Sequence, residues 1–195
     1  MGPRPYTAST RAPRRGRDPT TRETGDPMRV LYFFSVWLHI LAAITWIGGM
    51  LFLVLVVVPW MRQGHRIEAG AFLRETGVRF RNVGWTCFGI LLVTGTFNLW
   101  VRGVRLENFT SPEWLSSSFG QTVVLKLAFF VAVLVVSSVH DFVVGPRATV
   151  AIERGPGSPE AMALRRRASM LGRLNLLFAL VLVALGVMIV RGALW

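Results

Sequence analysis

The stretch Lys126–Arg147, KLAFFVAVLVVSSVHDFVVGPR, decides the fold of this chain of 195 residues. Its apolar run is long enough for a helix to cross the ~30 Å hydrocarbon core of a bilayer. The same stretch contains the single lysine of the chain, Lys126, and the pair His140–Asp141. Ionisable side chains inside a membrane are costly unless they are paired or face a cavity, so these residues require an explanation.

Three further apolar runs accompany this one, and together they predict an all-α fold, an integral membrane four-helix bundle. Hydrophobic residues make up 52% of the sequence and charged residues only 16%, which is too apolar for an ordinary soluble domain. Backbone groups in lipid must bond within their own segment, so each run is expected to be helical. The predicted spans are residues 31–59, 83–101, 122–144 and 171–192, in one domain covering 28–195.

The segment before the first span has a different composition. Residues 1–27 are rich in Arg, Pro, Thr and Gly and have no apolar face, so we expect a disordered tail. An organellar transit peptide is one alternative, and a true start at Met28 is another. The formal net charge of +12 is compatible with nucleic-acid binding. The arginines lie in the tail and between the spans, however, so no nucleic-acid partner is expected.

Arginines are concentrated in two of the three connections between spans. Residues 61–82 contain five and residues 145–170 contain five, whereas the second connection contains only Arg102 and Arg105. The positive-inside rule therefore places the first and third connections in the cytoplasm and both termini outside. If the arginines of the tail are counted, the orientation becomes ambiguous.

Two local features are expected within the cytoplasmic connections. Residues 67–76 are expected to form a short helix on the membrane surface, and Gly145–Pro146 is expected to end the third span.

His39 is the first candidate ligand, because imidazole binds haem iron and copper. Trp46 and Gly48–Gly49 follow it at helical spacing, and the glycines are expected to leave room for a flat ligand or for another helix. The alternative is a histidine that is hydrogen-bonded to a neighbouring helix.

Lys126 and His140–Asp141 are the other candidates. Lys126 either holds an anion such as a propionate or extends its ammonium to the head groups. His140–Asp141 is either a lock between helices, with Arg147 or Arg173 as the cation, or a proton-relay or metal-binding pair. Helical rise places His39 and Lys126 in the outer half of the bundle and His140 in the inner part, so one haem between both histidines is doubtful. A polar cluster is predicted at the inner level, formed by Asp141, Arg81, Arg173 and Asn175.

Three stretches carry a resemblance to a known family. VWLHILAAITWIGGM, FRNVGWTCFGILLVTGTFNLW and FGQTVVLKLAFFVAVLVVSSVHDFVVGPR resemble the CopD family, named for copper resistance protein D. A more distant similarity is to HemJ-type protoporphyrinogen oxidase. The resemblance implies a four-helix membrane module associated with copper or with haem b. It implies cofactor binding by His39, Lys126 and His140, with the two histidines as metal ligands.

We therefore predict a protein that handles copper, by uptake, transport or delivery, across the cytoplasmic membrane of a bacterium. One alternative is a haem-b-binding oxidoreductase of the HemJ type, and another is a non-catalytic membrane scaffold. The expected cofactor is copper or haem b. The expected partners are the lipid bilayer and either a copper-binding periplasmic protein or a redox partner. The sequence contains no metal-spacing cluster, nucleophile triad or P-loop, so catalytic residues stay unknown.

Overall fold

The computed structural model describes residue 2, residues 26–155 and residues 157–192. The predicted disordered tail lies almost entirely outside these residues. Within the described ranges the chain contains helices and turns and no strand, which confirms the all-α class. Four of its segments are long and apolar enough to cross a membrane.

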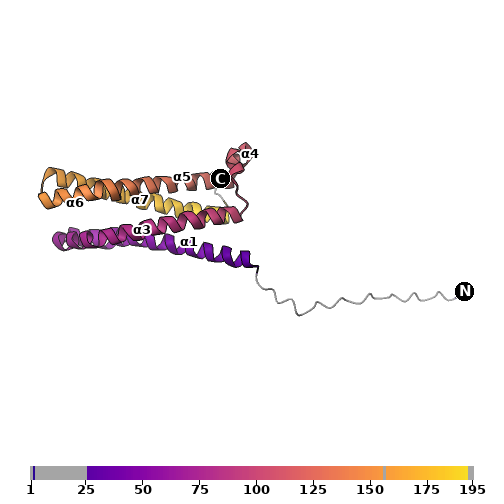
Figure 1. Cartoon of the computed structure of the whole chain (residues 1–195), viewed down its shortest axis with the longest axis horizontal. Coiled ribbons are helices and arrows are strands. Elements are labelled where there is room, and N and C mark those ends of the chain that lie inside the picture. The colour runs from indigo at the N-terminus through magenta and orange to yellow at the C-terminus, as the bar shows by residue number, and fades with distance from the viewer. Residues whose placement is uncertain (1, 3–25, 156, 193–195) are drawn as a thin grey trace.

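Each predicted span corresponds to one long helical segment (Figure 1). The first consists of α1 (Pro27–Phe52), the π-helical turn η1 (Leu53–Val57) and α2 (Val58–Arg62), and the second is α3 (Arg66–Val101). The third consists of α5 (Ser118–Ser138), the π-helical turn η3 (Val139–Val144) and α6 (Gly145–Arg154), and the fourth is α7 (Pro159–Arg191). The connection between α3 and α5 contains a 3-10 turn, η2 (Leu106–Thr110), and a short helix, α4 (Pro112–Ser116).

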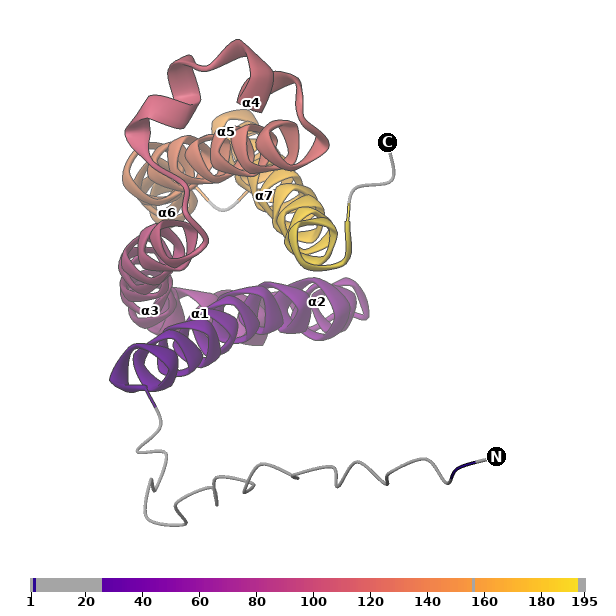
Figure 2. The ribbon, with the colours of Figure 1, turned by 90° about the vertical axis from the view of Figure 1, so that its right-hand side faces the viewer.

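The four segments pack as two antiparallel hairpins. α1 lies along α3 and α5 lies along α7, while α1 also touches α7 and so joins the hairpins (Figure 2). We call the end of the bundle where α1 and α5 begin the proximal end. The opposite end, where α2 is followed by α3 and α6 by α7, is the distal end (Figure 1).

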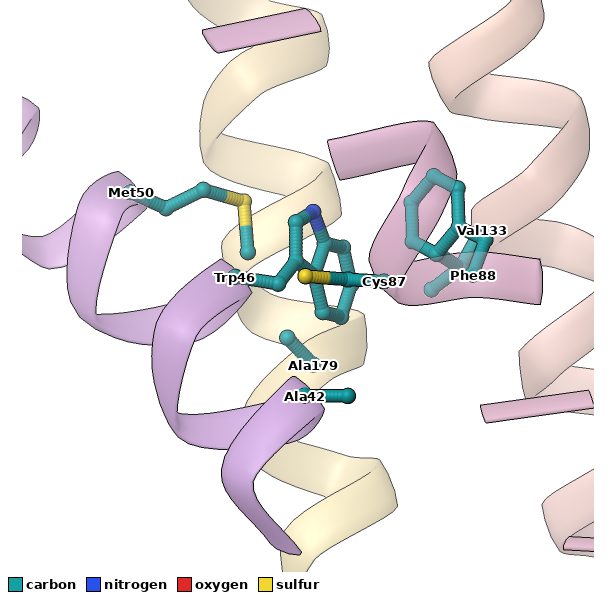
Figure 3. Close-up of a cluster of buried hydrophobic side chains, with 7 residues drawn as sticks. All are labelled: Ala42, Trp46, Met50, Cys87, Phe88, Val133 and Ala179. Atoms are coloured by element: carbon teal, nitrogen blue, oxygen red, sulfur yellow. The ribbon is translucent and has the colours of Figure 1, made fainter. Parts of the chain in front are cut away.

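An apolar cluster fills the middle of the bundle and draws on all four segments (Figure 3). Its buried members are Ala42, Trp46, Met50, Cys87, Phe88, Val133 and Ala179. The rings of Trp46 and Phe88 meet edge to face, with centroids 4.8 Å apart. Because lipid is as apolar as these side chains, close packing rather than exclusion of water holds the helices together. The cluster also separates the polar residues of the proximal end from those of the distal end.

Gly145–Pro146 does not end the third span, contrary to the sequence-based expectation. The helix continues to Arg154, because the turn before the proline widens. Gly145 N–H bonds to the carbonyl of His140, five residues back, and Val58 N–H bonds in the same way to Leu53 ahead of Pro59. A π turn of this kind accommodates a residue without an N–H while the helix continues.

The expected surface helix at residues 67–76 is also wrong as a separate element. α3 begins at Arg66 and continues without a break into the membrane span, because no residue in between is a strong helix breaker. At ~1.5 Å per residue the helix is about 54 Å long, so its arginine-rich first part extends beyond the ~30 Å core. α4 and α7 begin at the N-caps Ser111 and Ser158, whose side chains each accept a backbone N–H.

We expect Gly120→Ala to destabilise the proximal end. A Cβ at this position would collide with the backbone carbonyl of Trp114, which closes the turn between α4 and α5. Overpacking against backbone costs ~1–3 kcal/mol, measurable as a lower free energy of unfolding in mixed micelles. The matched control is Gly89→Ala, where a Cβ meets nothing within 4 Å and a gain of up to about 1 kcal/mol is expected. Equal effects of the two substitutions would contradict this packing.

Candidate functional site

Polar side chains gather in two places, on either side of the apolar cluster. The proximal cluster consists of His39 on α1, Thr94 and Asn98 on α3, Arg102 directly after α3, and Lys126 on α5. The distal cluster consists of Trp85 on α3, Ser137 on α5, His140 and Asp141 in η3, and Asn175 on α7. Thus His39 and His140 belong to different sites, as the helical rise predicts.

The ring of His39 is oriented by a hydroxyl on the neighbouring helix. Its Nδ1 lies 2.8 Å from Thr94 Oγ1, and the same hydroxyl donates its hydrogen to the carbonyl of Ile90 at 2.6 Å. A threonine hydroxyl has only one hydrogen, so Thr94 accepts from His39 and Nδ1 carries the ring proton. The lone pair of a neutral His39 therefore lies on Nε2, which is available to a ligand.

Arg102 joins three helices at the proximal mouth. Its guanidinium donates to the carbonyl of Ile189 at 3.0 Å and to the hydroxyl of Tyr32 at 3.3 Å. The carbonyl of Ile189 belongs to the last turn of α7, where carbonyls lack intrahelical partners and the helix dipole is negative. The arginine thus links the two hairpins at the proximal end.

Lys126 is half-buried and lies near enough to His39 and Arg102 to interact electrostatically with both. Its positive charge acts on the ring of His39, and the charge of Arg102 acts in turn on Lys126. A Cβ added to Gly186 on α7 would lie 3.5 Å from Nζ, so the ammonium is turned toward α7. This position does not fit the expectation that the side chain extends to the head groups. Lys126 forms no hydrogen bond or ion pair with any other residue that the structure describes.

His39 and Lys126 occupy equivalent places in the two hairpins. His39 lies twenty residues before Pro59, and Lys126 lies twenty residues before Pro146. Each basic side chain packs on a glycine of the second helix of its own hairpin, His39 on Gly95 and Lys126 on Gly186. The shared plan brings both groups to the same depth.

In the distal cluster, one carboxylate is shared by two donors. Asp141 Oδ1 lies 2.8 Å from His140 Nδ1, and Oδ2 accepts from the indole Nε1 of Trp85 at 3.1 Å. Neither Arg147 nor Arg173, the expected cations, forms an ion pair with Asp141 among the residues described, so that expectation is wrong. The carboxylate keeps the Nδ1 proton of His140 in place, so Nε2 of this histidine is also available.

The predicted polar cluster at the distal level forms only in part. Asn175 is buried and donates to Ser137 Oγ at 3.0 Å, with Met50 Sδ at 3.9 Å. Arg81 stacks over the ring of Phe142, 5.5 Å from its centroid, next to Asp141. Arg173 is exposed, and it has no bonding partner among the residues described.

Of the two expectations for Gly48–Gly49, the structure supports close approach of another helix at Gly49 and not room for a flat ligand. A Cβ on Gly49 would collide with the ring of Phe80, and Gly48 is exposed with nothing within 4 Å. Trp46 is buried in the apolar cluster (Figure 3). The residues below His39 therefore do not fit a haem inside the bundle.

Several residues of the two clusters were not predicted from the sequence. A spacing of four residues places Thr94, Asn98 and Arg102 on one face of a helix. This spacing could have identified them as a polar group from the sequence. The equal sequence separation of His39 from Pro59 and of Lys126 from Pro146 was a second signal of the same kind. Trp85 gave no such signal, because its bond to Asp141 depends on how α3 packs against the third span.

The comparisons with known proteins agree with this architecture. Residues 74–194 match the family of copper resistance protein D, CopD, which covers more than half of the chain. The chain is also 33% identical, over 166 residues, to a protein of Aquifex aeolicus (strain VF5) without an assigned function. That alignment covers 85% of this chain and 97% of the relative. No solved structure matches.

This chain therefore belongs to the CopD family and is a multi-pass membrane protein. The family match is to CopD. The more distant similarity to HemJ-type protoporphyrinogen oxidase is not supported.

We expect Thr94→Val to lower the free energy of unfolding by ~1–3 kcal/mol, because it leaves the Nδ1–H of His39 buried without an acceptor. Thr96→Val is the matched control on the same helix. Its hydroxyl bonds only to the carbonyl of Leu92 and the residue is exposed, so a change within ~0.5 kcal/mol is expected. The free energy of unfolding of both variants is measured by following the folded fraction as sodium dodecyl sulfate is added to mixed micelles. If the two variants unfold alike, the bond to His39 contributes nothing.

Proposed function

We propose that this chain handles copper at the cytoplasmic membrane of a bacterium, and that His140 is the side chain that meets the ion. Membership of the copper resistance protein D family gives the substrate class. The observation that carries the proposal is the Nδ1 bond of His140 to Asp141, with Nε2 left available. A histidine that ligates a metal commonly donates its other nitrogen to a carboxylate, which orients the ring and makes it more basic.

His140 suits a cation better than His39 does. Asp141 places a negative charge beside His140, and 38% of the histidine side chain is exposed. At His39 a copper ion would meet the positive charge of Lys126 instead. Repulsion between like charges therefore favours the distal site for a metal ion.

The distal site supports transfer of copper rather than storage. The described residues contain no group of three or more His, Cys, Asp or Glu side chains that would enclose an ion. A pathway needs contacts that are favourable enough to receive an ion and weak enough to release it. We propose that His140 provides one such contact, with further ligands from a copper-binding partner or from water.

The distribution of arginines supports the orientation that the sequence predicts. α3, α6 and the first part of α7 carry most of the arginines of the described residues toward the distal end, whereas Arg29, Arg102, Arg105 and Arg191 lie toward the proximal end. We propose that the distal end faces the cytoplasm. Copper would then meet His140 near the cytoplasmic mouth.

A reporter fused after residue 195 tests this orientation. An alkaline phosphatase fusion, active only outside the cytoplasm, is expected to be active, and a green fluorescent protein fusion to stay dark. The same pair fused within the turn at residues 63–65 should give the opposite result. A fluorescent C-terminal fusion would reverse the assignment and place the proximal cluster in the cytoplasm.

For copper, we expect His140→Ala to abolish binding of Cu(I) by the protein purified in detergent. Asp141→Asn is expected to weaken binding ~10–100-fold, because the ring loses its orienting carboxylate. The control is His65→Ala, which removes the exposed histidine that stacks on Trp60 near the same end and should bind as the wild type does. Competition with a chromogenic Cu(I) chelator measures the Cu(I) affinity of the wild type and of the three variants.

The same preparation distinguishes the alternatives. If His140→Ala binds copper as tightly as the wild type, the proposed site is wrong. A reducible Soret band that is lost in His39→Ala would instead support a haem-b protein. If the protein folds normally but binds neither copper nor haem, the membrane-scaffold alternative is supported.

A further inference from the structure

The proximal cluster contains positive charge that no acidic side chain of the described residues balances. Lys126 and Arg102 influence each other electrostatically, and the one ion pair found among these residues, His140–Asp141, lies in the distal cluster. A charged lysine in the interior of a membrane is costly. Such residues usually pair with an opposite charge or with a ligand, and Lys126 has no such partner in the part of the chain described.

Two further features make this a built site rather than a stray charge. The ammonium is turned toward Gly186 instead of toward the lipid. Arg102 is held at the proximal end by its bonds to Tyr32 and Ile189, so its position does not depend on a ligand.

The equivalence of His39 and Lys126 gives the cluster two faces. In each hairpin a basic side chain lies against a glycine, and the two side chains approach from opposite hairpins. The two basic groups lie close enough for the charge of Lys126 to act on the ring of His39. The apolar cluster lies between this region and the distal cluster, so we expect a ligand to enter from the proximal end or from the lipid.

We propose that the proximal cluster binds the anionic head group of an amphipathic molecule, a phosphate or a carboxylate, through Lys126 and Arg102. The apolar tail of that molecule lies along the bundle, where the exposed apolar side chains of the spans face lipid. The site is separate from the copper contact at His140, so either proposal can fail without the other.

Native mass spectrometry of the protein in a mild detergent tests the proposal with two pairs of probes. Phosphatidylglycerol is compared with phosphatidylcholine, whose phosphate is balanced by its own cation, and palmitate is compared with hexadecanol. We expect the wild type to retain one molecule of an anionic probe with about tenfold lower Kd than its counterpart, equivalent to ~1.4 kcal/mol. Preference in the first pair identifies a phosphate ligand, and preference in the second identifies a carboxylate.

Three variants locate the binding. Lys126→Gln is expected to lose the preference, and Lys126→Arg, which keeps the charge, is expected to retain it. Arg105→Gln is the matched control, because it removes one positive charge at the same end. Its guanidinium bonds to the carbonyls of Trp100 and Val104, not to the cluster. Thermal unfolding of each variant checks that the fold is kept.

The proposal is overturned if neither anionic probe is preferred, or if Lys126→Gln binds like the wild type. It is also overturned if Arg105→Gln loses as much affinity as Lys126→Gln, since the preference would then reflect total charge rather than a site. Should Lys126→Gln fail to fold, Arg102→Gln is measured in its place, and an unchanged preference in that variant contradicts the proposal.

Discussion

The bilayer imposes the constraint on which the rest of this structure depends: a polar side chain inside it must find a partner within the protein. The apolar cluster around Trp46 and Phe88 meets this demand by containing almost no polar atoms. The polar residues are consequently divided between its two sides. This division, rather than any single bond, gives the molecule two separate sites with different chemistry.

The two sites differ in the sign of the charge beside the histidine. At His140 the neighbour is a carboxylate, itself bonded to the indole of Trp85, so the site suits a cation. At His39 the neighbours are a hydroxyl and an ammonium, so the site suits a neutral or anionic group. Histidine alone would not distinguish the two, because both rings have Nδ1 engaged and Nε2 available.

The hairpin plan explains how these sites acquired their positions. Each hairpin begins at the proximal end, passes a π turn before a proline and returns from the distal end. The π turn in the third segment includes His140 and Asp141 themselves, so the irregular turn that accommodates Pro146 also sets the direction of the candidate copper ligand. Such turns occur often at functional sites, since the wider turn re-aims side chains without ending the helix.

The sequence by itself determined the class of the fold, the number of spans and the separate depths of His39 and His140. These follow from the length of the apolar runs and from helical rise, which are local properties. Only the tertiary structure decided that Phe80 fills the space beside Gly49, that Trp85 rather than an arginine satisfies Asp141, and that Lys126 turns toward Gly186. Those contacts join segments far apart in the chain, and the angle and rotation at which helices pack depend on many side chains at once.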